Sequence, residues 1–198
     1  MSPFHWIKSR IFDWSFSHMD PLRQETVERA QGEVLEVGFG TGRNLCHYGS
    51  SVKSLTALDP VSYQELDKIE ARIVAAAFPV ERCILSAEDE LPFDAARFDS
   101  LVTTWTLCTI PDVDRALAEM KRVLKPGGRY LFVEHGRAEA PGTARWQDRL
   151  NPYWARVSDG CNMNRPIDRM VEDAIKAEDL EPQLRVMDIA EIVEERSG

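Results

Sequence analysis

A short apolar stretch that runs into three glycines constrains the fold of this chain most. Residues 33–37 read Glu-Val-Leu-Glu-Val, and Gly38, Gly40 and Gly42 follow at alternate positions. Glycine accepts positive φ angles and has no Cβ, so such a loop can turn sharply from a strand into a helix and lets a ligand approach the backbone. The stretch predicts a parallel strand followed by a ligand-binding turn, although a tight turn alone is the alternative.

The spacing of the glycines argues against a dinucleotide cofactor. A Gly-x-Gly-x-x-Gly loop would place its third glycine at position 43, which is Arg43 here. Glu36 would lie at the carboxyl end of a buried strand, where a carboxylate is costly unless it meets a cation or strong donors. An ammonium group on a ligand would satisfy it. We therefore expect a nucleoside-containing cofactor other than NAD.

Size and charge limit the class of protein. A chain of 198 residues fits one domain, 1–198. A net charge of −9 and a pI near 5.0 would repel a phosphate backbone, so nucleic acid is a poor substrate. No apolar run approaches the ~20 residues that span a bilayer, and the first ten residues do not resemble a secretory signal. We expect a soluble, cytoplasmic protein without a transmembrane segment.

The four cysteines are far apart in the sequence. Cys46, Cys83, Cys108 and Cys161 include no Cys-x-x-Cys pair. Their spacing indicates neither a zinc site nor a disulfide framework, and it suits a reducing compartment. We predict no metal site.

Strand-like and helix-like segments alternate along the chain. This alternation predicts an α/β fold in which helices cover both faces of a mostly parallel sheet and ligands bind at the carboxyl ends of the strands. Asp112 is expected to cap the last of the helices in the core, and Lys-Pro-Gly-Gly at 125–128 to end it. The predicted strands are 33–37, 53–58, 83–85, 98–104, 129–134 and 183–189, and the predicted helices lie within 4–31, 42–49, 62–77 and 112–124.

The segment Glu-x-Gly-x-Gly-x-Gly at the end of the first strand resembles the class I S-adenosylmethionine-dependent methyltransferases. The resemblance implies a three-layer, Rossmann-like sandwich with S-adenosyl-L-methionine as cofactor and S-adenosyl-L-homocysteine as product. It divides the chain into N-terminal helices (1–31), a cofactor-binding core (32–135), a substrate-covering insert (136–180) and an atypical C-terminus (181–198). The implied cofactor-binding residues are Glu36, Gly38, Gly40, Gly42, Asp59, Pro60, Ala87, Glu88 and Thr104.

Two of these predicted contacts have simple alternatives. Asp59 ends the second strand, where a carboxylate can accept hydrogen bonds from both ribose hydroxyls, but Asp-Pro also suits a surface turn. Ala87 and Glu88 resemble the loop beside the adenine. Many relatives have Asp where this chain has Ser86, which could instead be a helix N-cap.

Residues 43–48 and 133–165 resemble the methyltransferase-like thiol methyltransferases and their bacterial relatives, and the similarity covers roughly 11–170. It implies methyl transfer to a small thiol. No metal is required, and an imidazole could deprotonate the thiol, with His135 as the candidate and His47 as the second choice. The predicted acceptor contacts are Trp105, Trp146, Cys161 and Asn162. For the histidines and tryptophans, ordinary packing is the alternative.

The end of the chain departs from the family pattern, in which an antiparallel seventh strand follows the sixth. Here an acidic segment follows residue 189. Either the seventh strand is absent, which leaves a sheet edge that must be covered or paired with another subunit, or the sequence diverges or is truncated near its end. We expect a monomer or homodimer.

Three other functions remain open. A lipid-like acceptor, either a quinone precursor or phosphatidylethanolamine, would suit peripheral membrane contact through the aromatic segment 4–16. A non-catalytic cofactor-binding protein is the second, and a nicotinamide oxidoreductase the third.

Overall fold

Six parallel strands form one sheet, in the order β3-β2-β1-β4-β5-β6. The computed structural model describes residues 20–60, 66–175 and 184–187. The strands are β1 (Gly32–Val37), β2 (Val52–Leu58), β3 (Val80–Cys83), β4 (Phe98–Thr104), β5 (Leu124–His135) and β6 (Leu184–Met187).

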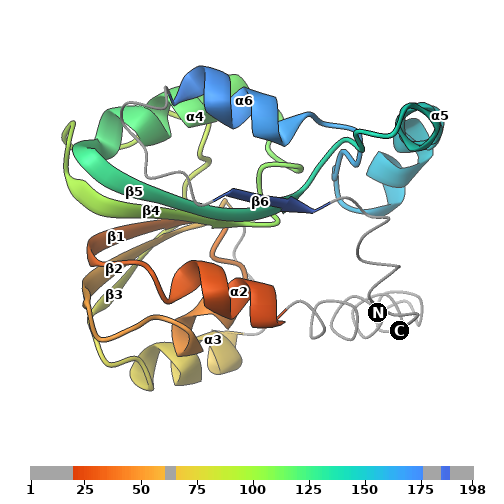
Figure 1. Ribbon diagram of the computed structural model, residues 1–198. Coiled ribbons are helices and arrows are strands. Elements are labelled where there is room, and N and C mark those ends of the chain that lie inside the picture. The colour runs from red at the N-terminus through yellow and green to blue at the C-terminus, as the bar shows by residue number, and fades with distance from the viewer. Residues whose placement is uncertain (1–19, 61–65, 176–183, 188–198) are drawn as a thin grey trace.

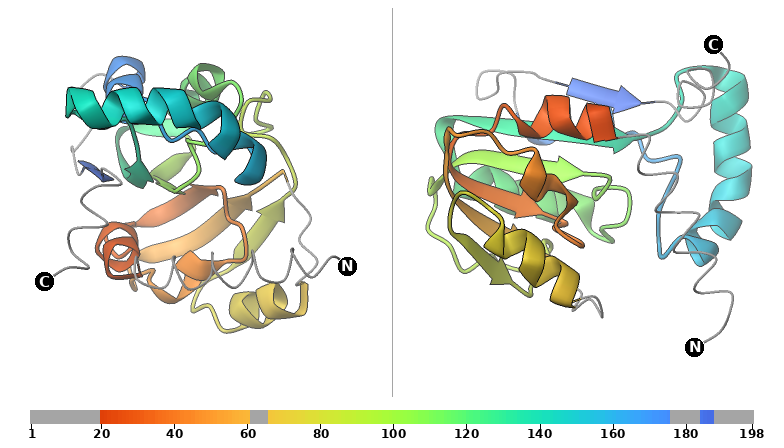
Figure 2. Two further views of the ribbon diagram at one scale, coloured as in Figure 1. Left: turned by 90° about the vertical axis from the view of Figure 1, so that its right-hand side faces the viewer. Right: turned by 90° about the horizontal axis from the view of Figure 1, so that it is seen from below.

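Helices cover both faces of this sheet, as predicted. α2 and α3 lie on one face and α4 and α6 on the other, while α5 lies beyond the carboxyl ends of the strands (Figures 1 and 2). The helices are α2 (Asp20–Val27), the 3₁₀ turn η1 (Arg43–Cys46), α3 (Leu66–Val74), α4 (Val113–Val123), α5 (Pro141–Val157) and α6 (Ile167–Ala174). The predicted three-layer α/β class is confirmed.

The two faces of the sheet bury separate apolar clusters. Val34 belongs to the same buried cluster as Ile69 of α3, whereas the next residue, Leu35, belongs to the cluster that contains Leu117 of α4. Successive side chains of a strand point to opposite faces, so a strand covered on both sides buries side chains on each face. This explains why Val34, Leu35 and Val37 of β1 and Leu101 and Val102 of β4 are all buried, although both strands also contain polar residues.

Several predicted elements are confirmed with small boundary shifts. The strands predicted at 33–37, 53–58 and 98–104 correspond to β1, β2 and β4, and the helix at 112–124 to α4. Asp112 caps α4, because its side chain accepts a hydrogen bond from the backbone N–H of Arg115 at 3.1 Å.

Two predicted elements were wrong in length or place. The helix expected at 42–49 is only the 3₁₀ turn η1, which a left-handed Gly42 precedes. The third strand ends at Cys83 rather than beginning there, since it pairs with β2, whose last residue, Leu58, lies opposite Cys83. Ile84, expected inside the strand, is 58% exposed.

β5 is longer than predicted because the Lys-Pro-Gly-Gly segment belongs to it. The segment does end α4, but the strand pairing resumes at once: Phe98 lies opposite Leu124, and Ser100 lies opposite Arg129. The extra residues between these pairs form an irregularity in which Gly127 has a φ of 73°.

The predicted sixth strand corresponds to β6, which pairs directly with β5 in parallel. The segment 4–16 and the acidic C-terminus after 189 lie outside the described residues, so the predictions about them stay predictions.

Candidate cofactor and acceptor site

The three glycines after β1 all have positive φ angles, as expected: 80° at Gly38, 57° at Gly40 and 75° at Gly42. A Cβ on Gly38 would lie 2.0 Å from Oγ1 of Thr106, and one on Gly42 would lie 2.9 Å from Cζ of Phe39. Both backbone conformation and space therefore require glycine at these two positions.

Asp59 lies beside this loop. The carboxyl ends of β1 and β2 are adjacent, with Val37 opposite Leu58. Oδ2 of Asp59 accepts a hydrogen bond from the backbone N–H of Gly40 at 2.9 Å, and the side chain is 8% exposed. The fold thus brings together the predicted glycine loop and the predicted ribose acid, with the exposed Pro60 next to them.

Glu36 is buried, and its own chain supplies the strong donors that the sequence led us to expect. Its Oε1 accepts a hydrogen bond from Nδ2 of Asn44 at 2.8 Å, and its Oε2 accepts one from the hydroxyl of Tyr48 at 2.7 Å. Burial raises the pKa of Glu36 to about 7, against the lowering effect of these two donors. We had considered a ligand ammonium group and had not identified Asn44 or Tyr48.

Arg23 of α2 joins this network and was also missed. Its Nη1 donates hydrogen bonds to Oδ1 of Asn44 at 2.5 Å and to Oγ1 of Thr104 at 2.8 Å. Its guanidinium carbon lies 4.7 Å from the centre of the Trp105 ring. Burial lowers the pKa of Arg23, while the nearby carboxyl of Glu36 raises it. A buried cation therefore links the ends of β1 and β4.

The loop after β4 is held by a second buried carboxylate, Glu134 at the end of β5. It accepts hydrogen bonds from the backbone N–H groups of Thr106 and Leu107 at 2.9 and 3.1 Å. Between Thr104 and Thr106, Trp105 has a φ of 51°, an unusual conformation for a bulky residue. These contacts fix the backbone where the resemblance implies cofactor and acceptor contacts.

The predicted adenine loop follows β3. Ala87 is buried in the core, and Oε2 of Glu88 accepts a hydrogen bond from the backbone N–H of Asp112 at 2.9 Å. Residues 84–90 form no helix, so the alternative that Ser86 is a helix N-cap was wrong.

Three side chains far apart in sequence meet near the ends of β4 and β5. Nε2 of His135 lies 3.1 Å from Sγ of Cys161. The ligand atoms of Cys108, His135 and Cys161 all lie within 4.8 Å of one another. His135 and Cys161 were predicted acceptor-side residues, whereas nothing in the spacing had pointed to Cys108.

The two thiols of this cluster differ in acidity. A hydrogen bond from the Cys108 thiol lowers the pKa of Cys161; burial opposes this effect, and the contact with His135 adds to it. The same hydrogen bond, together with burial, raises the pKa of Cys108 well above its usual range. Burial opposes the charged form of His135, but the contact with Cys161 raises its pKa on balance.

Asn162 and Trp146 occupy different environments. The backbone N–H and Nδ2 of Asn162 both donate to the carbonyl of Cys108, at 2.9 and 3.2 Å, so Asn162 holds the turn that carries Cys161. Trp146 is 60% exposed on α5, and the guanidinium of Arg149 lies over its ring. The acceptor role of Trp146 stays a prediction.

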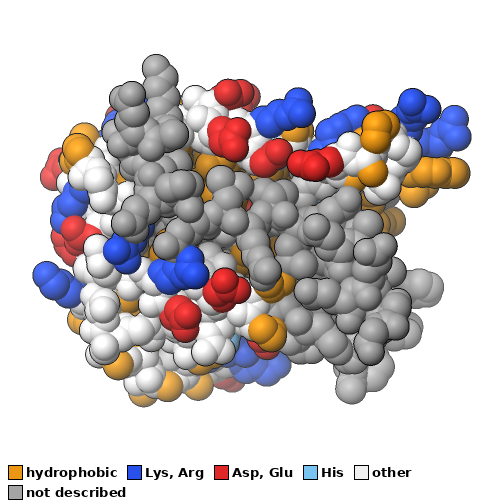
Figure 3. All heavy atoms as spheres, in the orientation of Figure 1, with side chains coloured by type: hydrophobic (Ala, Val, Ile, Leu, Met, Phe, Trp, Pro, Cys, Tyr) orange, Lys and Arg blue, Asp and Glu red, His pale blue; other side chains and the backbone are white. Residues whose placement is uncertain are grey.

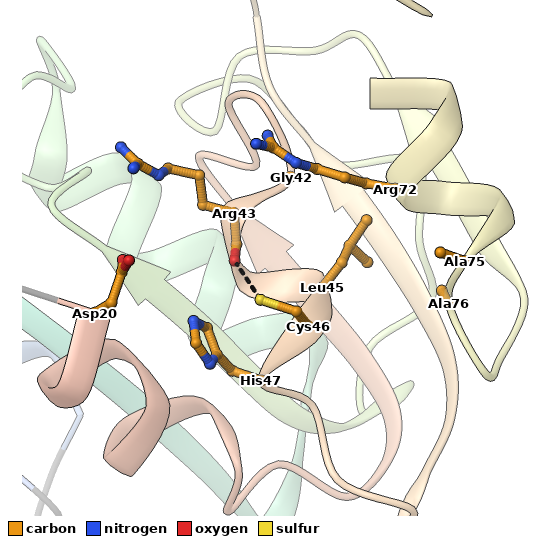
Figure 4. Close-up of a pocket in the computed structure, with 9 residues that line it drawn as sticks. All are labelled: Asp20, Gly42, Arg43, Leu45, Cys46, His47, Arg72, Ala75 and Ala76. Atoms are coloured by element: carbon orange, nitrogen blue, oxygen red, sulfur yellow. Dashed lines mark hydrogen bonds between the residues drawn. The ribbon is translucent and has the colours of Figure 1, made fainter. Parts of the chain in front are cut away.

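A pocket of about 300 Å³ lies beside the glycine loop, between η1 and α3 (Figure 4). Among the predicted cofactor residues, only Gly42 lines it. Nη1 of Arg72 donates to the carbonyl of Thr41, which ties α3 to the loop. His47, the second candidate base, lines this pocket together with Asp20. His47 is therefore placed with the residues of η1 rather than with those around His135.

Acidic and basic side chains are interspersed over the described part of the face in Figure 3. No helix within the described ranges has the length and apolar character needed to cross a bilayer.

A family model described as a methyltransferase domain matches residues 35–132, from β1 into β5. The chain belongs to the class I S-adenosylmethionine-dependent methyltransferases. Among curated methyltransferases, it is 34% identical over 143 residues to human (Homo sapiens) thiol S-methyltransferase TMT1A, an alignment that covers 71% of this chain and 58% of the relative. It is 32% identical over 130 residues to phosphatidylethanolamine N-methyltransferase of Cereibacter sphaeroides, covering 63% of each.

The chain thus spans less than two thirds of the length of either relative. Among solved structures, a protein from Bacillus halodurans C-125 described as a methyltransferase is 25% identical and superposes with a TM-score of 0.64. That match covers 80% of this chain and 68% of the other, and it supports the assignment of the fold.

Proposed function

We propose that this chain binds S-adenosyl-L-methionine over the carboxyl ends of β1, β2 and β4 and transfers its methyl group to a small thiol. The observation that carries the proposal is the junction of the loop at 38–42 with Asp59, through the hydrogen bond from Gly40. The similarity to TMT1A favours a thiol as the acceptor.

The residues at this junction fit the chemistry of the cofactor. The glycine loop presents backbone without side chains, which suits close contact with the methionine part. Asp59 has the carboxylate needed for ribose hydroxyls, and Ala87 and Glu88 follow the neighbouring strand, on the side proposed for the adenine. Thr104 lies at the end of β4, on the side proposed for the methionine group.

The cofactor would supply a methyl group on a sulfonium, which is already activated for displacement. The protein then has to align the acceptor sulfur with the methyl carbon and exclude water. We assign acceptor binding to Trp105 and to the pair of His135 and Cys161. Since Nε2 of His135 already contacts Cys161, a proton from the acceptor would be shared with this pair rather than taken by His135 alone.

Product analysis tests the proposal. Purified protein is incubated with cofactor that carries a deuterated methyl group, together with hydrogen sulfide or a small alkyl thiol and, in parallel, with small amines and phenols, and labelled products are measured by mass spectrometry. We expect label in the methylated thiol and none with Gly40→Val, whereas Glu70→Ala, an exposed change on α3, should behave as wild type. Label in amines or phenols but not in thiols would reject the thiol. Cofactor binding without any labelled product would favour a non-catalytic role.

A lipid-like acceptor is the second candidate, and an apolar stripe on α5 favours it. Trp146, Leu150, Tyr153 and Val157 follow helical spacing and are 46–67% exposed. The same helix carries Arg145, Arg149 and Arg156. Exposed aromatic residues with basic neighbours suit the surface of an anionic membrane, and the similarity to phosphatidylethanolamine N-methyltransferase points the same way.

Sedimentation with anionic liposomes tests this second candidate. Tyr153→Asp should reduce binding, because it places a negative charge in the stripe. Val74→Asp is the matched control, since Val74 is 84% exposed on α3. Equal sedimentation of wild type and both variants would reject a membrane role for α5.

A further inference from the structure

The cluster of Cys108, His135 and Cys161 combines the ligand types of a soft metal ion. Cys108 lies in the turn after β4, His135 is the last residue of β5, and Cys161 lies in the turn after α5. Their Sγ and ring nitrogen atoms lie within 4.8 Å of one another. Tetrahedral zinc bonded to sulfur at ~2.3 Å and nitrogen at ~2.0 Å separates ligand atoms by roughly 3.5–3.8 Å. Small side-chain adjustments would bring the three atoms to that spacing.

Hydrogen bonds that do not involve the three ligand side chains hold the backbone segments on which these side chains lie. Asn162 joins the turn of Cys161 to the carbonyl of Cys108 through two hydrogen bonds. Nη1 of Arg165 donates to the carbonyls of Leu107 and Ile110, on either side of Cys108, at 2.5 and 2.7 Å. The two sulfur positions are therefore set by bonds that a metal would leave in place.

Burial and charge also suit a divalent cation. Cys108 is 2% exposed and Cys161 is 9% exposed. Two thiolates, a neutral imidazole and a divalent cation have no net charge, which matters because an unbalanced charge is costly in a buried place. Calcium and magnesium prefer oxygen ligands, whereas zinc prefers this combination of sulfur and nitrogen.

We propose that Cys108, His135 and Cys161 bind a zinc ion and leave its fourth coordination position to the sulfur of the methyl acceptor. The zinc site stands on the cluster alone, whereas the role of the fourth position rests on the proposed function. His135 then acts as a metal ligand, and the metal rather than a general base promotes loss of the acceptor proton.

The chemical step balances without another reactant. The acceptor thiol displaces a water molecule from the metal, and its proton passes to solvent. A lone pair of the acceptor sulfur then forms the bond to the methyl carbon. The bond from that carbon to the sulfonium breaks, and its electron pair stays on the cofactor sulfur. The neutral thioether product leaves the metal.

Metal content tests the site without any activity assay. The full chain, purified without a metal-affinity tag, is incubated with zinc, dialysed and analysed by mass spectrometry of the metal. We expect an equimolar amount of zinc, lost in Cys108→Ser, Cys161→Ser and His135→Gln. Cys83→Ser should keep it, since Cys83 lies at the end of β3 and outside the cluster.

Cobalt substitution keeps the test valid if a variant fails to fold. The cobalt-loaded wild type should show thiolate-to-cobalt charge-transfer absorption. A wild type that retains no zinc, or whose cobalt form lacks this absorption, overturns the metal site. Hydrogen sulfide should shift the cobalt spectrum, and an unchanged spectrum would overturn the role of the fourth position.

The outcomes separate this inference from the proposed function. Full thiol methylation by protein stripped of metal with a chelator would overturn the role of the metal and leave thiol methylation standing. Zinc binding without methylation of any thiol would leave the metal site standing and reject the proposed function and, with it, the role of the fourth position.

Discussion

Glu36 and Arg23 are buried charged residues that share a hydrogen-bond partner. Asn44 connects them, since it donates to Glu36 and accepts from Arg23. A buried network of hydrogen-bonded polar groups makes local structure specific, and the loss of one member leaves the others without partners. Two predictions follow from the two charges.

Glu36 should make the protein less stable as the pH rises. Its pKa in the folded state is about 7, above the ordinary value of 4.5. Its stabilising contribution is therefore full below about pH 4.5 and is lost as the pH rises through 7. Arg23, Tyr48 and Asp59 are the titratable groups that act on it.

Urea unfolding at pH 5.5 and 7.5 measures this effect. The contribution of Glu36 to the free energy of unfolding should fall by about 2 kcal/mol between these pH values. Glu36→Gln should lack this part of the pH dependence. An identical pH dependence in wild type and variant would contradict the assignment.

Arg23→Met should destabilise the fold by about 3 kcal/mol, because it leaves the buried carboxyl of Glu36 without its nearby cation and removes the donor to Thr104. Arg29→Met is a suitable control, since Arg29 pairs with Glu25 at the surface, where such pairs contribute at most about 1 kcal/mol. Similar losses in the two variants would show that the Arg23 network contributes little.

At the scale of the element, the loop at 38–42 and the end of β2 act as one unit. Gly40→Val should abolish binding of S-adenosylhomocysteine, because its side chain would occupy the space proposed for the ligand and would strain a residue with a φ of 57°. Asp59→Ala should weaken binding by ~1–3 kcal/mol through lost charged hydrogen bonds. Glu70→Ala on α3 should bind as wild type. Calorimetric titration measures all three, and unchanged affinity in the first two would overturn the site assignment.

The elements predicted best were those in which the pattern of apolar residues and capping residues is clear in the sequence. β1 and β4 each have buried apolar residues on both faces of the sheet, and α4 has both an apolar stripe and a capping Asp112. A longer helix was predicted in place of η1 because the glycines before it indicate where a helix can begin but not where it ends. β3 was misplaced because its residues are only partly buried, so pairing with β2 rather than apolarity sets its limits.

The residues of the candidate site could be predicted from the sequence where they lie together in one short segment. Gly38, Gly40 and Gly42 could be found from the sequence because they occupy alternate positions within one short segment. Arg23 and Cys108 could not, since their partners are far away in the chain. The buried carboxylate of Glu36 was the one available signal for Asn44 and Tyr48, which are polar residues shortly after the loop.

For the whole molecule, the order of the strands decides where the chemistry can take place. β1 and β4 lie at the centre of the sheet, between β2 and β5, so the ends of all four strands are neighbours. Asp59 follows β2 and His135 ends β5, which places the proposed ribose and acceptor contacts on either side of the central pair. α5 lies beyond these strand ends (Figure 2). A cofactor that extends across these strand ends would bring its methyl group between the two sides.

A crystal structure of the complex with S-adenosylhomocysteine tests this arrangement most directly. We expect the homocysteine part to lie against the backbone of 38–42, the ribose hydroxyls to bind Asp59 and the sulfur to lie on the side of His135 and Cys161. A complex in which the protein's own side chains fill the space above β1 and β2, with the ligand bound elsewhere, would contradict it.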